Sequence, residues 1–147
     1  MSAPDNRMVL ELASHASNVS IARVVVAAFI TPIDPDVTEL NDIKTAVSEA
    51  ITNAIIHGYA ENEAMTVRMT LTLTDRTLTI DVTDNGIGID DVACAREPLF
   101  TTLPDMERSG LGFTVMESFM DTVDVISTPG VGTTVTMTKN IRKANEA

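Results

Sequence analysis

Three polar side chains recur at every fourth position of AVSEAITNAIIHGY, residues 46–59. They are a carboxylate, a carboxamide and an imidazole, contributed by Glu49, Asn53 and His57. An α-helix turns about 100° per residue, so four steps drift by only about 40° and the three side chains share one face. Apolar residues fill the adjoining faces, and polar groups beside a buried flank need a partner or a use. The segment predicts one helix with a reactive stripe; the alternative is an amphipathic helix whose stripe only faces water.

Two glycine clusters follow this segment and could hold a ligand against the backbone. In DNGIGI, residues 84–89, Asp84 closes a predicted strand, where a carboxylate can accept a hydrogen bond from a ligand amino group. In RSGLGF, residues 108–113, the glycines open a predicted helix, so free N–H groups and the helix dipole point at a bound anion. The second cluster lacks the Gly-Lys-Ser/Thr of a Walker A loop. We therefore expect a phosphate site of another type.

Composition narrows the functional classes. The chain has 147 residues, 44% of them hydrophobic, which suggests one domain with a sizeable core. A net charge of −11 and few aromatic residues argue against direct binding of nucleic acid. Cys94, the single cysteine, fits a reducing compartment and is interpreted as a packed side chain. No signal peptide or membrane-spanning run is evident, so we expect a cytoplasmic protein without membrane contact.

The patterns around these residues predict an α+β fold. Alternating apolar residues and threonines across residues 67–82 predict an antiparallel hairpin with a tight turn at Asp75-Arg76. Asp36 or Thr38 is expected to cap the long helix, and Gly58 to end it. The other expected elements are strands at 8–12, 123–126 and 133–138, helices at 19–30, 90–96 and 114–120, and a loop at 98–109. Their order predicts a single domain over residues 1–147, a two-layer sandwich of a mixed, mostly antiparallel sheet with helices on one face.

The order of the motifs resembles the GHKL superfamily of ATP-binding domains, which gyrase, MutL and histidine kinases share. Residues 49–57 resemble its N box, residues 84–88 its G1 box and residues 108–112 its G2 box, and the turn at 132–134 resembles the start of its last strand. The resemblance covers about residues 8–139. It is closest to bacterial anti-sigma factors that are also serine protein kinases, carried by IKTAVSEAITNAIIHGY, PLFTTLPDMERSGLGFTVMESFMD and ARVVVAAF.

This resemblance implies a role for each motif in phosphoryl transfer. Glu49 would be the general base towards a serine hydroxyl, and Asn53 would be a ligand of Mg²⁺. Asp84 would accept from the adenine amino group, assisted by Thr133, and residues 98–109 would form a lid. His57 would have a structural role at the helix end. The positions implied to bind ATP or ADP are Asn53, Asp84, Gly86, Gly88, Arg108, Ser109, Gly110, Leu111, Gly112, Phe113 and Thr133.

The resemblance also implies protein partners. Arg23 would belong to a surface that contacts a sigma factor and an anti-anti-sigma protein, which carries the substrate serine. The first helix and its edge would form a homodimer face. An acidic body is compatible with the basic surface of a sigma factor.

Several other functions stay open at the level of sequence. An ATP hydrolase would use Glu49 to activate water, although gyrase-like enzymes also use a transducer domain. A histidine kinase fragment would need a phosphoacceptor, and the SHASN segment around His15 does not resemble one. A nucleotide-gated binding module would lack catalysis, against which the pairing of Glu49 with Asn53 argues. The general-stress anti-sigma serine kinases are the nearest alternative within the same class.

Overall fold

The computed structural model describes residues 4–58, 65–86 and 112–142 of the chain. Its strands are β1 (Asn6–Ala13), β2 (Thr66–Thr74), β3 (Thr77–Asp84), β4 (Thr122–Thr128) and β5 (Gly132–Asn140). Its helices are α1 (Asn18–Ile30), α2 (Val37–Asn53) and α4 (Gly112–Phe119), with short helical turns η1 (Thr31–Ile33) and η2 (Ala54–Gly58). Every strand and helix expected within the described residues is present. The helix expected at 90–96 and the loop expected at 98–109 lie outside them.

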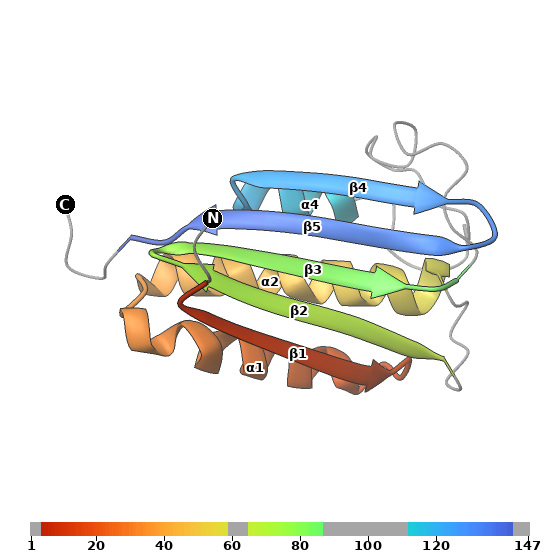
Figure 1. The fold of residues 1–147 in the computed structure, drawn as a ribbon, viewed down its shortest axis with the longest axis horizontal. Coiled ribbons are helices and arrows are strands. Elements are labelled where there is room, and N and C mark those ends of the chain that lie inside the picture. Colours follow the sequence, from red (N-terminus) through yellow and green to blue (C-terminus); the bar gives the residue numbers. More distant parts are fainter. Residues whose placement is uncertain (1–3, 59–64, 87–111, 143–147) are drawn as a thin grey trace.

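The five strands form one sheet in the order β1-β2-β3-β5-β4, and every neighbouring pair among these described strands is antiparallel. The helices lie together on one face of this sheet (Figure 1). The predicted two-layer α+β sandwich is therefore confirmed. The sheet was expected to be mixed and mostly antiparallel, and the described part contains only antiparallel pairs. Two of these pairs, β2–β3 and β4–β5, are hairpins.

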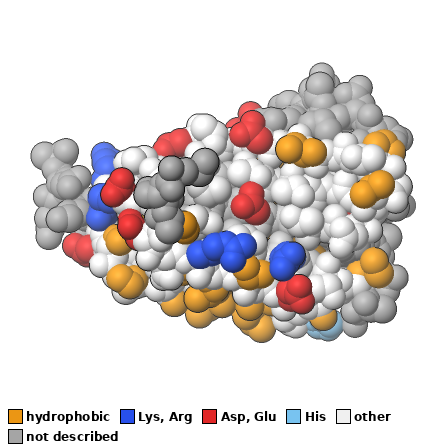
Figure 2. Space-filling model, viewed as in Figure 1, with side chains coloured by type: hydrophobic (Ala, Val, Ile, Leu, Met, Phe, Trp, Pro, Cys, Tyr) orange, Lys and Arg blue, Asp and Glu red, His pale blue; other side chains and the backbone are white. Residues whose placement is uncertain are grey.

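The alternation of residue types decides which side of the sheet is buried. Apolar residues of β2 and β3 point towards the helices and pack with Ile43, Val47 and Ile51 of α2, all fully buried. The threonines between them point to the other face, where most are half-buried. Figure 2 shows this outer face largely free of hydrophobic side chains, with a few charged groups among neutral ones. One buried face and one polar face is the usual pattern of an antiparallel sheet beside helices.

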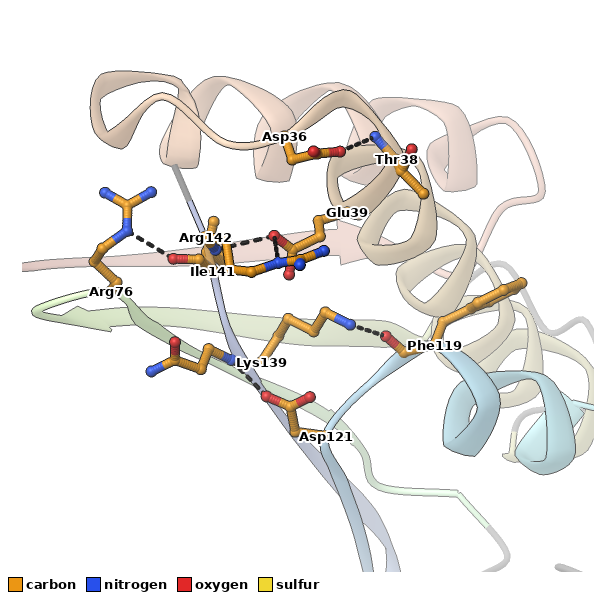
Figure 3. A network of polar contacts seen from close by, with 10 residues as sticks. Asp36, Thr38, Glu39, Arg76, Phe119, Asp121, Lys139, Ile141 and Arg142 are labelled. Atoms are coloured by element: carbon orange, nitrogen blue, oxygen red, sulfur yellow. Dashed lines mark hydrogen bonds and ion pairs between the residues drawn. The ribbon is translucent and has the colours of Figure 1, made fainter. Parts of the chain in front are cut away.

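The start of α2 is fixed by its cap. The side chain of Asp36 accepts a hydrogen bond from the Thr38 N–H at 2.7 Å, so Asp36 is the cap residue of the two that were expected. A buried carboxylate, Glu39, follows in the first turn and accepts from the backbone N–H of Arg142 at 2.9 Å. Next to it, Arg76 Nε donates to the carbonyl of Ile141 at 2.6 Å (Figure 3). These bonds fasten the chain after β5 to the beginning of α2.

The end of α2 differs from the prediction. The regular helix ends at Asn53, and residues 54–58 form a π-helical turn instead of continuing with the same period. This turn contacts β3 and β5 and buries both Ala54 and Ile55, at 3% and 4% exposure. The helical stretch reaches Gly58 as expected, but the prediction of one regular period up to that point was wrong, because a wider turn places consecutive apolar residues against the sheet.

No helix within the described ranges is long and apolar enough to cross a bilayer.

Candidate functional site

Four elements bring their ends together at one end of the sandwich. The C-terminal end of α2, the end of β3 and the beginnings of β5 and α4 all lie at the right in Figure 1. The π-helical turn after α2 contacts β3 and β5, and α2 packs along α4. Segments that are far apart in sequence therefore form one polar region, and most of the predicted site residues that the structure describes lie on them.

Glu49 and Asn53 lie one turn apart on α2 and are both half-buried, beside the buried Ala50 and Ile51. The predicted stripe is thus present for these two residues. His57 lies in the π-helical turn, where the period of α2 no longer applies, and its side chain is outside the description. The regular part of α2 therefore presents a carboxylate and a carboxamide, one acidic group and one neutral oxygen donor.

Asn53 faces the first residue of α4. A Cβ atom built on Gly112 would lie 3.0 Å from Asn53 Nδ2 and 3.1 Å from Asn53 Oδ1. Contacts of 3.0–3.4 Å are tighter than nine in ten real Cβ contacts, so a side chain on Gly112 would require Asn53 to shift by a few tenths of an ångström. The carboxamide of Asn53 therefore packs directly against the backbone at the N-terminus of α4, where helix N–H groups favour an anion.

Asp84 is the last residue of β3 and points inward, because it continues the buried alternation of Ile80 and Val82. Its side chain is only 5% exposed. Burial raises the pKa of the Asp84 carboxyl above its ordinary value of 3.8, and backbone hydrogen bonds from Gly86 and Thr133 offset part of that rise. The Gly86 N–H donates to Asp84 Oδ1 at 2.9 Å. A buried acceptor with spare lone pairs is suited to a ligand that brings an N–H donor.

Thr133 stands beside Asp84 because the two residues are partners in the register of β3 and β5. The close approach depends on Gly132, whose φ is +145°. A Cβ atom there would lie 2.1 Å from the Asp84 carbonyl oxygen. The hydroxyl of Thr133 shares a hydrogen bond of 2.7 Å with Ser127 Oγ across the β4–β5 hairpin. Asp84 and Thr133 are both buried polar residues, 5% and 8% exposed, on the helix-facing side of the sheet.

Other predicted site residues fall outside this cluster. Phe113 is 8% exposed and packs in the hydrophobic core. Arg23 lies on α1, where its Nη1 donates to Ser48 Oγ at 3.1 Å. The remaining predicted positions lie outside the described residues: Gly88, Arg108, Ser109, Gly110 and Leu111. Within the residues that are described, no group of three or more His, Cys, Asp or Glu side chains is arranged to hold a metal ion.

Two serines that the sequence reasoning passed over belong to this arrangement. Ser127 contacts Thr133, and Ser48 holds Arg23 one residue before Glu49. Ser127 pairs with Thr133 in the β4–β5 register, so the expected hairpin already carried that signal. Nothing in the sequence pattern connected Ser48 to Arg23, because that contact depends on how α1 packs on α2.

Comparisons with known proteins agree with this geometry. The family described as the histidine kinase-like ATPase domain matches residues 12–139. The anti-sigma F factor of Bacillus subtilis (strain 168) is 52% identical over 139 residues, covering 95% of this chain and 95% of that protein. The anti-sigma F factor of Clostridium beijerinckii is 52% identical over 135 residues, covering 92% of this chain and 94% of that protein.

Solved structures share the fold at lower identity. The RsbU and RsbW domains of Rv1364c from Mycobacterium tuberculosis align with a TM-score of 0.67 and 20% identity, over 94% of this chain and 32% of that one. Full-length ShkA in complex with AMPPNP aligns with a TM-score of 0.58 and 16% identity, over 97% of this chain and 33% of that one. At these identities the likeness shows the fold of an ATPase domain of the histidine kinase type.

Proposed function

The chain belongs to the anti-sigma F factor family, within the histidine kinase-like ATPase domains, and on that premise we propose that it is a nucleotide-dependent anti-sigma factor and protein serine kinase. It sequesters a sporulation sigma factor of the sigma F type. It also transfers the γ-phosphoryl group of Mg-ATP to a serine of an anti-anti-sigma antagonist, which inactivates that antagonist. The whole chain acts as one domain.

The observation that carries the nucleotide assignment is the buried pair Asp84 and Thr133 at the meeting point of β3, β5 and α2. A purine amino group supplies the N–H donor that the Asp84 carboxylate accepts, and the Thr133 hydroxyl is placed to assist. The N-terminus of α4 supplies N–H groups for phosphate oxygens. ATP or ADP therefore fits between the end of α2, Asp84 at the end of β3 and the start of α4.

Asn53 and Glu49 fit the transfer step. Mg²⁺ takes few protein ligands and keeps several waters alongside phosphate oxygens, so a single carboxamide oxygen from Asn53 suits it. An ion held there by Asn53 would supply positive charge to the phosphates. Glu49, one turn earlier, receives the proton of the serine hydroxyl as general base.

The partner surface is assigned to α1 and the edge strand β1. Arg23 is the basic residue of α1, and Ile21 and Val24 on the same helix are 48% and 67% exposed. Hydrophobic side chains gather along this edge of the molecule in Figure 2. Exposed apolar side chains beside a charged group are typical of protein interfaces. We assign the sigma factor and antagonist contacts to Arg23, and a homodimer contact to the same edge.

A phosphorylation assay tests this proposal. The purified chain is incubated with ATP labelled at the γ-phosphate, Mg²⁺ and an anti-anti-sigma protein. Stable label on an antagonist serine is the expected result. Free phosphate without labelled protein would instead indicate an ATP hydrolase, and acid-labile label on the chain itself would indicate histidine chemistry.

The role of Glu49 is tested separately. Glu49→Gln is expected to keep nucleotide binding and to abolish transfer, because the amide has no basic oxygen of comparable strength. Asp42→Asn, the same chemical change two turns earlier on α2, is the matched control and should transfer normally. Full transfer by Glu49→Gln would remove this residue from the role of base.

A further inference from the structure

Gly112 has a feature that phosphate binding does not require. The carboxamide of Asn53 lies close to the point where a side chain on Gly112 would begin, with Nδ2 at 3.0 Å and Oδ1 at 3.1 Å from that point. The carboxamide carbon lies 3.4 Å from the same point. A Cβ atom there would make a contact tighter than nine in ten real Cβ contacts, so the amide of Asn53 would have to shift by a few tenths of an ångström.

The backbone at Gly112 does not itself need glycine. Gly112 is the first residue of α4, and its φ lies outside the positive range that ordinary residues avoid. Alanine would also keep the backbone N–H that a helix start offers to an anion. What alanine would change is the space beside α2, because the atoms nearest to its methyl group all belong to Asn53.

We propose that Gly112 is a positioning residue for Asn53, whose missing side chain leaves the room in which the carboxamide presents its oxygen to Mg²⁺. This inference rests on the proposed function, which makes Asn53 the metal ligand. The packed start of α4 limits the rotamers of Asn53 from one side. Because Mg²⁺ demands near-ideal octahedral geometry at short distances, a displaced oxygen ligand loses much of its value.

The consequence is a specific dependence on metal. A methyl group at position 112 pushes the carboxamide of Asn53 away and weakens binding of Mg-ATP. It leaves binding of metal-free ATP nearly unchanged, because Asp84, Thr133 and the N–H groups of α4 are not displaced. If Gly112 served only to bind phosphate, its substitution would lower the affinity for Mg-ATP and for metal-free ATP equally.

Calorimetric titration of Gly112→Ala with ATP, in the presence of Mg²⁺ and in the presence of EDTA, tests the inference. Overpacking of this kind gives roughly a tenfold loss of Mg-ATP affinity. The affinity for metal-free ATP should stay within about twofold of wild type. Ser118→Ala, on the exposed side of the same helix, is the matched control and should leave both affinities unchanged. Thermal unfolding of each variant verifies that α4 is still folded.

A double-mutant cycle makes the assignment independent of folding losses. In an Asn53→Ala background the methyl group meets no carboxamide, so Gly112→Ala should have little further effect on Mg-ATP binding. Additive losses in the double variant would overturn the inference, as would equal losses with and without Mg²⁺ in Gly112→Ala. If the nucleotide affinity of the wild type does not depend on Mg²⁺, the assignment of Asn53 as a metal ligand is wrong, and this inference is wrong with it.

Discussion

The chemistry of the site is set by a few polar residues that are buried from solvent. Asp84 and Thr133 are nearly as buried as the core around them, yet each has a polar partner: Gly86 for the first and Ser127 for the second. A buried carboxylate is tolerated when hydrogen bonds compensate for lost water. The bonds to Asp84 leave acceptor capacity on its oxygens, and this capacity makes it selective for a donor on a ligand.

The raised pKa of Asp84 predicts an acid-sensitive site. The ionised carboxylate is the form that accepts from an amino group, so nucleotide affinity should fall as the pH drops through the raised pKa, at a higher pH than for an ordinary aspartate. Isothermal titration between pH 4 and pH 8 measures this loss, and Asp84→Asn should bind weakly with little dependence on pH. A wild-type midpoint at or below 3.8 would contradict the burial argument.

The same shift has a signature in stability. Between 3.8 and the raised pKa, folded Asp84 is protonated while the unfolded residue is ionised, so the folded state binds more protons. The contribution of Asp84 to the free energy of unfolding therefore falls as pH rises through this window and is constant above it. Urea unfolding of the wild type and of Asp84→Asn across pH measures the difference.

Substitution by alanine should destabilise the fold to very different extents at Gly130 and Gly132, the two glycines of the β4–β5 turn. Gly132→Ala would place a Cβ atom 2.1 Å from the Asp84 carbonyl oxygen and would hold an alanine at a φ of +145°. The expected loss in the free energy of unfolding is roughly 3 kcal/mol or more. Gly130→Ala meets no atom within 4 Å and bears only the strain of its φ of +80°, about 1–2 kcal/mol. Urea unfolding compares the two. Equal losses would show that the approach of β5 to β3 is not what requires Gly132.

At the scale of elements, α2 joins the proposed partner surface, the proposed catalytic residues and the sheet. Its start is fixed by Asp36 and its last regular residue is Asn53. Arg23 of α1 contacts the side of α2 by donating a hydrogen bond to Ser48. The Ser48 hydroxyl in turn donates to the Lys44 carbonyl at 2.9 Å. The π-helical turn then redirects the chain into the sheet, a type of irregularity that is frequent at functional sites.

The bond between Arg23 and Ser48 predicts coupling between α1 and α2. A double-mutant cycle of Arg23→Ala and Ser48→Ala should give a coupling free energy of about 1 kcal/mol in urea unfolding, the worth of a partly buried hydrogen bond to a charged donor. Thr45→Ala is the matched control: its hydroxyl also bonds back within the helix, to the Asn41 carbonyl at 3.0 Å. It should show no coupling with Arg23→Ala, and equal coupling in both cycles would contradict the direct contact.

At the scale of the whole molecule, the end proposed to bind nucleotide and the opposite end of the sandwich are built differently. The opposite end is closed by Glu39, Arg142 and Arg76, which join the start of α2, the chain after β5 and the β2–β3 turn (Figure 3). Ile141 between them is fully buried. These contacts link the chain after β5 to the start of α2, the two elements that carry Thr133 and Asn53 at the other end.

Weakening that closure should lower stability without altering the site chemically. Glu39→Ala leaves the partly buried N–H of Arg142 without its acceptor, with an expected loss of about 1–2 kcal/mol in the free energy of unfolding, measured with urea. Glu39→Gln keeps an acceptor oxygen and should lose less than half of that. The side chain of Arg142 is 63% exposed, so Arg142→Ala, which retains the backbone N–H, should lose under about 1 kcal/mol. A larger loss for Arg142→Ala than for Glu39→Ala would reverse this ranking.

The sequence by itself determined most of the local structure. Strict alternation in β2 and β3 specified which faces are buried, since a strand has a period of two. The spacing of Glu49 and Asn53 placed them on one helix face, and the motif order indicated the superfamily that the comparisons then matched. These inferences held because each depends on neighbours within a few residues or on a pattern read along the chain.

Tertiary structure decided what depends on packing between distant segments. The sequence did not show that helix period changes at Ala54, that Ser48 meets Arg23, or that Asn53 lies against Gly112. Each is fixed by how α1, α4 or the sheet packs on α2, and side-chain contacts of about 3 Å are sensitive to small shifts in that packing. The local pattern of apolar and polar residues determines the type of element and its buried face. The packing of two elements against each other determines which of their residues are in contact.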